Sequence, residues 1–80
     1  MSIKVYDNNG RSFDRYTIID LSSPEGNDCY TALAASEDPF HPQGFGQWCS
    51  AMLGSHLGRE ISFDQLPAKV QTFVKAQLEL

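Results

Sequence analysis

The chain has 80 residues, of which 41% are apolar and 20% charged, and this composition is too apolar for a disordered protein. A chain of this length can build one globular domain, which we expect to span residues 1–80. The formal net charge is −4 and residues 16–58 contain no Lys or Arg, which argues against nucleic-acid binding because that needs clustered cations. No apolar run approaches the ~20 residues of a membrane span and charges interrupt the N-terminus, so we expect a cytoplasmic protein with no signal peptide and two free thiols.

Three short strands are predicted in the first half of the chain, where apolar and β-branched residues alternate with polar ones. They cover residues 3–6, 13–21 and 29–36, although the alanines of the third segment would also suit a helix. Asn9 and Gly10 predict a turn at residues 7–11, and a cluster of Ser, Pro, Gly and Asp predicts a loop at 22–28. These connections are too short for a parallel crossover, so the predicted sheet is antiparallel.

The last part of the chain predicts a helix that begins at Pro67, because proline suits the first helical position. One stripe at helical spacing holds the apolar residues Leu66, Val70, Phe73, Val74 and Leu78. A helix of about 12 residues is marginal alone, so this stripe must pack on the sheet. The predicted fold class is α+β: a three-stranded antiparallel sheet with one C-terminal helix packed on a face, and a long ordered loop rich in proline, glycine and aromatic residues.

The predicted loop covers residues 37–47. Its two X-Pro bonds hold the chain extended and its glycines free the backbone around Phe45. A loop of defined shape is suited to binding, although its aromatic rings would serve equally to close one end of the core. We expect Trp48 to be mostly buried and Phe45 to be the more exposed ring. The candidate binding residues are Phe40, His41, Gln43, Phe45 and Gln47.

Residues 48–58 show no clear period. Phe45, Trp48 and Met52 fit one face of a helix, but the glycines at 46, 54 and 58 argue against a long helix. The sequence therefore does not decide between a short helix and a loop in this segment.

A cysteine hydrolase is the enzymatic alternative, with Cys49 as nucleophile and His41 or His56 as base. Gln43 stands six positions before the cysteine, as the oxyanion glutamine does in papain-like enzymes. The match is poor, because the tryptophan of those enzymes follows the cysteine and Trp48 precedes it. The sequence therefore favours a protein without catalytic residues.

Metal and phosphate binding are also disfavoured. A zinc site built from Cys29, His41, Cys49 and His56 would lack the closely spaced ligand pair of structural sites. The glycines at 44 and 46 lack the Lys-Ser/Thr that follows a phosphate-binding loop. We expect no cofactor and no metal.

Five short sequence motifs along the chain are similar to those of a known protein family. They are Tyr6-Asp7-Asn8-Asn9-Gly10, Phe13-Asp14-Arg15-Tyr16-Thr17, the run from Pro39 to Gln47 (Pro-Phe-His-Pro-Gln-Gly-Phe-Gly-Gln), His56-Leu57-Gly58 and Leu66-Pro67-Ala68-Lys69-Val70-Gln71. They resemble a family of small, uncharacterised phage and prophage proteins over nearly the whole chain. The resemblance implies a mobile-element origin and the cytoplasm of a bacterial host, and no particular activity.

The residues and the resemblance together predict a non-catalytic accessory protein that binds a host or phage protein. Binding would use the proline-glycine-aromatic loop and the acidic middle of the chain, which holds Asp20, Glu25, Asp28, Glu37 and Asp38. Mimicry of a phosphate strand by these acidic residues is a special case of the same hypothesis.

Overall fold

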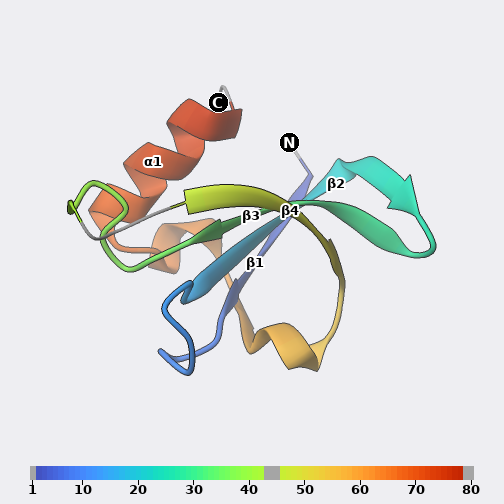
Figure 1. Ribbon diagram of the computed structural model, residues 1–80, viewed down its shortest axis with the longest axis horizontal. Helices are drawn as coiled ribbons and strands as arrows, with labels where there is room; N and C mark the ends of the chain where they lie inside the picture. Colours follow the sequence, from blue (N-terminus) through green and yellow to red (C-terminus); the bar gives the residue numbers. More distant parts are fainter. Residues whose placement is uncertain (1, 43–45, 79–80) are drawn as a thin grey trace.

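A five-stranded antiparallel sheet with a helix against one face forms the fold, as the computed structural model of residues 2–42 and 46–78 shows (Figure 1). The strands are β1 (Ile3–Asp7), β2 (Tyr16–Gly26), β3 (Cys29–Ala35), β4 (Gly46–Met52) and β5 (Arg59–Ile61). The short 3-10 helices η1 (Ser55–Leu57) and η2 (Phe63–Gln65) flank β5, and the long helix is α1 (Ala68–Leu78). The order across the sheet is β4-β3-β2-β1-β5, so β1 to β4 form a meander and β5 returns to pair with β1.

The prediction of three strands is wrong, because β4 and β5 extend the sheet at its two edges. All seven residues of β4 pair with β3, from Ala35 opposite Gly46 to Cys29 opposite Met52. The predicted loop is therefore shorter than residues 37–47, and the segment with no clear period begins as a strand. Pairing with β3 decides this, because glycine, serine and alanine have little preference for strands on their own.

The prediction of a loop at residues 22–28 is also wrong. β2 continues to Gly26, and a two-residue turn connects it to β3 through Asn27 and Asp28, which both have positive φ. Pro24 is tolerated because it lies at a register shift between β2 and β3, and because β1 pairs with β2 only as far as Asp20. Proline was thus a sign of a bulge, not of a loop.

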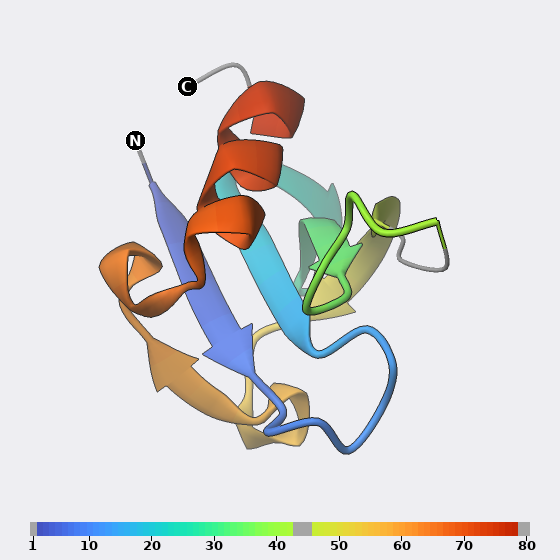
Figure 2. The same cartoon turned by 90° about the vertical axis from the view of Figure 1, so that its left-hand side faces the viewer.

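One face of the sheet carries the larger core, under α1. Strand alternation places Val5, Ile18 and Leu33 side by side in one cross-strand row. The fully buried Val70 and Val74 of α1 pack on this row. Figure 2 shows α1 in front of β1 and β2, with β5 to one side and β4 to the other. The helix therefore covers the middle of the sheet, and β4 lies towards the margin of this face.

The opposite face holds a second, smaller core built from Tyr6, Ile19 and Ala32. The segment that joins β4 to β5 runs between the two edges of the sheet, and its residue Leu57 packs on this core. In Figure 1 this gold segment passes below the strands. Both faces of the central strands are buried as a result.

An ion pair fixes the start of β2 against the end of β1. Arg15 donates from Nε to Asp7 Oδ1 at 2.7 Å and from a terminal nitrogen to Asp7 Oδ2 at 3.1 Å. Arg15 also contacts the exposed Glu37 at 2.7 Å. Hydrogen bonding from Arg15 holds the pKa of the buried Asp7 carboxyl below its usual value, and the Asn9 backbone N–H and the charge of Arg59 act in the same direction.

Asp7→Asn should therefore lower the free energy of unfolding at pH 7 by about 1–2 kcal/mol, because it leaves Arg15 without its buried partner. The pKa of Asp7 is lowered in the folded state, so its contribution is fully present above about pH 4 and is lost as the pH falls through the folded value. Denaturant titrations between pH 2 and pH 7 should show a shallower loss of stability in acid for Asp7→Asn than for the parent. Glu37→Gln is the matched control with an exposed carboxyl. If the free energy of unfolding falls with decreasing pH equally steeply in Asp7→Asn and in the parent, the ion pair between Arg15 and Asp7 does not stabilise the fold.

Candidate functional site

β4 is an edge strand whose free side is unpaired. It bonds to β3 on one side, and no strand of the described residues lies on the other. Over the residues that the structure describes, no further backbone–backbone hydrogen bond reaches Gly46–Met52. In an antiparallel pair, alternate residues direct their N–H and C=O groups away from the partner strand. β4 therefore offers a row of backbone donors and acceptors to a further strand.

The two edges of the sheet differ in how they resist such pairing. β5 has three residues, of which Arg59 and Glu60 are charged and exposed. A short, charged edge is the usual protection of natural sheets against added strands. β4 has seven residues with the sequence GQWCSAM, which contains no charge and no proline. Only the β4 edge is thus long and neutral enough to accept a partner strand.

Side chains on the α1 side of β4 are exposed next to this edge. Strand alternation places Trp48, Ser50 and Met52 on that side, because Trp48 lies opposite Leu33 of the α1-side core. Leu33 is 1% exposed, whereas Trp48 is 47% and Met52 48% exposed. Two large apolar side chains, spaced along one face of a free edge, form an exposed apolar row.

Ser50 and Glu25 hold β4 in place between these two side chains. Glu25 accepts hydrogen bonds from the hydroxyls of Ser50 and of Thr31, so one carboxylate of β2 joins β3 and β4. These two bonds, from Ser50 first, lower the pKa of Glu25. Glu25 is therefore ionised at neutral pH and gives this surface a negative charge beside Trp48 and Met52.

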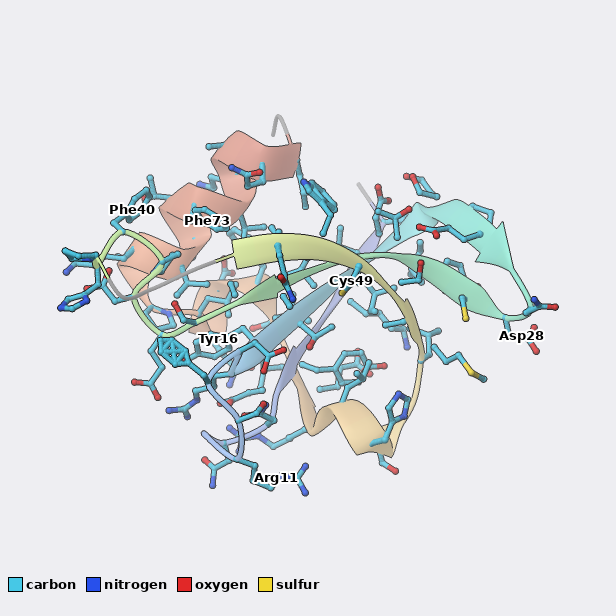
Figure 3. The ribbon with its side chains drawn as sticks, in the orientation of Figure 1. Arg11, Tyr16, Asp28, Phe40, Cys49 and Phe73 are labelled. Carbon is cyan, nitrogen blue, oxygen red and sulfur yellow. The ribbon has the colours of Figure 1, made fainter. Side chains whose placement is uncertain are left out.

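Phe40 extends the exposed row beyond the start of β4. Asp38 shapes the loop by accepting a hydrogen bond from the Phe40 N–H at 3.2 Å, and Lys69 ties Asp38 to α1 at 3.2 Å. The Phe40 ring meets Phe73 of α1 edge to face, with centroids 5.9 Å apart, as the labelled side chains in Figure 3 show. Phe40 remains 59% exposed.

Gly46 explains how Phe73 reaches the edge of the sheet. A Cβ at Gly46 would overlap the Phe73 ring, so the ring lies directly on the backbone of β4. Phe73, predicted as part of the buried stripe of α1, is only partly buried and connects α1 to Phe40 and β4. We call the exposed face formed by Phe40, Trp48, Ser50 and Met52, together with the free backbone of β4, the β4 edge surface.

The five residues predicted for binding do not form one site. Phe40 lies on the β4 edge surface, whereas Gln47 alternates with Trp48 and faces the opposite side of the sheet, across from Ala34. His41 lines a pocket of about 530 Å³ with Phe13 and Arg15. Gln43 and Phe45 lie outside the described residues. The expectation that Phe45 is exposed concerns one of them and therefore stays a prediction.

The sequence context of Trp48 predicts a mostly buried ring, and it does not identify Met52 as a surface residue. The first expectation is wrong, because the ring is nearly half exposed. Residues 48–52 read Trp-Cys-Ser-Ala-Met, in which apolar and polar residues do not alternate, so the sequence pattern gives no clear sign of strand β4. The glycines around this segment argue against a helix and a strand alike.

The enzymatic alternative gains no support from the surroundings of Cys49. Cys49 is exposed, and partial desolvation of its thiol, together with the carboxylates of Asp14 and Glu25, raises its pKa. A nucleophilic cysteine needs the opposite shift, because the thiolate is the reactive form. Cys29 and Cys49 are free thiols. Within residues 2–42 and 46–78, no three His, Cys, Asp or Glu side chains converge as metal ligands would.

The architecture is that of a small α+β protein whose sheet has one long, uncharged edge at β4 and one short, charged edge at β5. Comparison of the chain with protein-family models, curated proteins and solved structures finds no match. None of the helices in the described part of the chain has the length and apolar character needed to cross a membrane.

Proposed function

We propose that this chain is a non-catalytic binding protein that takes up an extended segment of a partner protein as an added strand beside β4. The observation that carries the proposal is the free, uncharged edge of β4 with Trp48 and Met52 exposed beside it. Strand addition to an exposed edge is a common mode of peptide recognition, in which backbone hydrogen bonds supply affinity and alternate side chains supply specificity.

The dimensions and chemistry of the β4 edge surface describe the partner segment. Seven residues of β4 extend over roughly 23 Å and would pair with a segment of similar length. Its apolar side chains would contact Trp48 and Met52, and tryptophan is among the residues that most often dominate interface energies. A basic side chain would lie near Glu25, which is ionised and accepts bonds only from Ser50 and Thr31 among the described residues. The expected partner is an apolar segment with a basic residue.

The biological setting is part of the proposal and depends on the resemblance to small phage and prophage proteins. It suggests that the partner is a host or phage protein, met in the cytoplasm of a bacterial host. Neither the site nor its chemistry depends on that setting.

Selection from a random linear peptide library tests the proposal and does not require the partner to be identified first. The parent protein should select peptides with apolar residues in alternation and at least one Lys or Arg. The double variant Trp48→Ala/Met52→Ala should bind a selected peptide at least about tenfold more weakly, because it removes the exposed side chains that the added strand contacts. Isothermal titration calorimetry measures both affinities.

Phe13→Ala is the matched control, since Phe13 is also an exposed aromatic residue, 56% exposed, but lies in the β1–β2 loop. It should leave the affinity unchanged. Equal affinities of the double variant and the parent would contradict the proposal. So would a parent protein that sediments as a dimer and becomes a monomer in the double variant, because the β4 edge would then be occupied by a second copy.

A further inference from the structure

A second pocket lies at the other edge of the sheet, away from the β4 edge surface. It has a volume of about 550 Å³ and lies between the β1–β2 loop and the junction of η1 with β5. The lining residues that matter for its chemistry are Asp7, Asn9, Arg11, Ser55, Gly58 and Arg59. Two elements far apart in the sequence therefore form its walls.

The charge of this pocket is positive, although the whole chain is acidic. Arg11 and Arg59 line it, and within the described residues neither forms an ion pair. Its one acidic residue, Asp7, is already engaged by Arg15 through both carboxylate oxygens and by the Asn9 N–H at 2.7 Å. Because Arg15 already neutralises Asp7, the two guanidinium groups of Arg11 and Arg59 leave the pocket with an excess of positive charge, although the charge of Arg59 also acts on Asp7.

The walls of the pocket are held rigidly. Arg11 is anchored by a bond from Nε to the Asn8 carbonyl oxygen at 3.2 Å, which leaves its two terminal nitrogens for a ligand. Gly58 lies so close to Asp7 O and the Asn8 Cα that a Cβ would overlap both. This contact fixes the η1–β5 wall, with Arg59 and Ser55, against the β1–β2 loop. Figure 3 shows Arg11 at the outer end of that loop.

We propose that this pocket binds an oxyanion, a phosphate or carboxylate group, through the guanidinium groups of Arg11 and Arg59 and the hydroxyl of Ser55. Guanidinium groups present paired N–H donors that match the oxygens of both groups. The volume exceeds what a single ion needs, so the anion would be one group of a larger ligand. The site is separate from the β4 edge surface, and either one can exist without the other.

Titration of the ¹⁵N-labelled protein with sodium phosphate, and separately with sodium acetate, at constant ionic strength tests this site. The backbone signals of Asn9, Gly10 and Gly58 and the Nε–H signals of Arg11 and Arg59 should shift and saturate. Sodium chloride at the same ionic strength should not produce a saturable shift. If only phosphate saturates the shifts, the pocket is a phosphate site. If only acetate does, it is a carboxylate site, and if both do, it is a general oxyanion site.

Arg11→Gln and Arg59→Gln should each weaken binding about tenfold, as loss of a charge-assisted hydrogen bond does. Lys69→Gln removes the same charge at an exposed position elsewhere and should leave the affinity unchanged. Dispersed spectra establish that each variant is folded, and the two arginine variants test the site independently. Shifts that never saturate, or that are the same in both arginine variants as in the parent, would overturn the proposal.

Discussion

Gly58→Ala should destabilise the protein more than alanine at any other glycine that the structure describes. Gly58 has φ 108° and ψ −152°, a conformation that is essentially restricted to glycine and costs other residues about 1–3 kcal/mol. The added Cβ would also overlap the backbone at Asp7 and Asn8, which cannot move without disturbing β1. We expect a loss of about 3 kcal/mol or more, and a melting temperature lower by at least about 12 °C.

Gly10→Ala is the control for this substitution. Gly10 also has a positive φ, 83°, but no atom lies within 4 Å of the position that its Cβ would take. The cost should be limited to backbone strain of about 1–2 kcal/mol. Thermal unfolding followed by circular dichroism compares the two variants. Equal losses would mean that the η1–β5 junction does not press against the end of β1, and that the anion pocket is not rigid.

Leu33→Ala should cost about 3 kcal/mol, the second large effect that the structure predicts. Leu33 is 1% exposed and lies in the cross-strand row beneath α1. Removing its side chain leaves a cavity between the sheet and the helix, which rigid neighbours fill only in part. Such a loss is a large share of the total stability of about 4–12 kcal/mol expected for a chain of this length.

Trp48→Ala is the informative comparison, because Trp48 lies directly opposite Leu33 on the same face of the sheet. It removes the larger side chain, yet the ring is nearly half exposed, so the cost should be about 1 kcal/mol or less. Urea unfolding of both variants measures the difference. A loss for Trp48→Ala as large as that for Leu33→Ala would show that Trp48 belongs to the core, as its sequence context suggested, and is not a surface for binding.

The sequence was informative where one regular period dominated. The alternation around Ile18 and Ile19 predicted β2, and the spacing of Val70 and Val74 predicted α1 and the face it buries. Such patterns are visible because each element buries a face of its own.

Long-range pairing determined the rest, and local patterns do not record it. β4 exists because β3 aligns it, although Gly46 and Ser50 do not favour a strand. Pro24 lies within β2 because β1 has already ended beside it. The exposure of Phe40 depends on where Phe73 docks, thirty-three positions later in the chain. Arg11 and Arg59 line one pocket only because β5 returns to β1.

Amide hydrogen exchange along β4 tests the central proposal, strand addition to this edge, most directly. In the free protein, the alternate amides of Gly46–Met52 that point away from β3 should exchange rapidly, and those bonded to β3 slowly. A saturating amount of a library-selected peptide should slow the rapid set about tenfold or more, because each N–H gains a carbonyl acceptor. Peptide binding that leaves the rapid set unchanged would contradict the account, as would slow exchange of all β4 amides in the free protein.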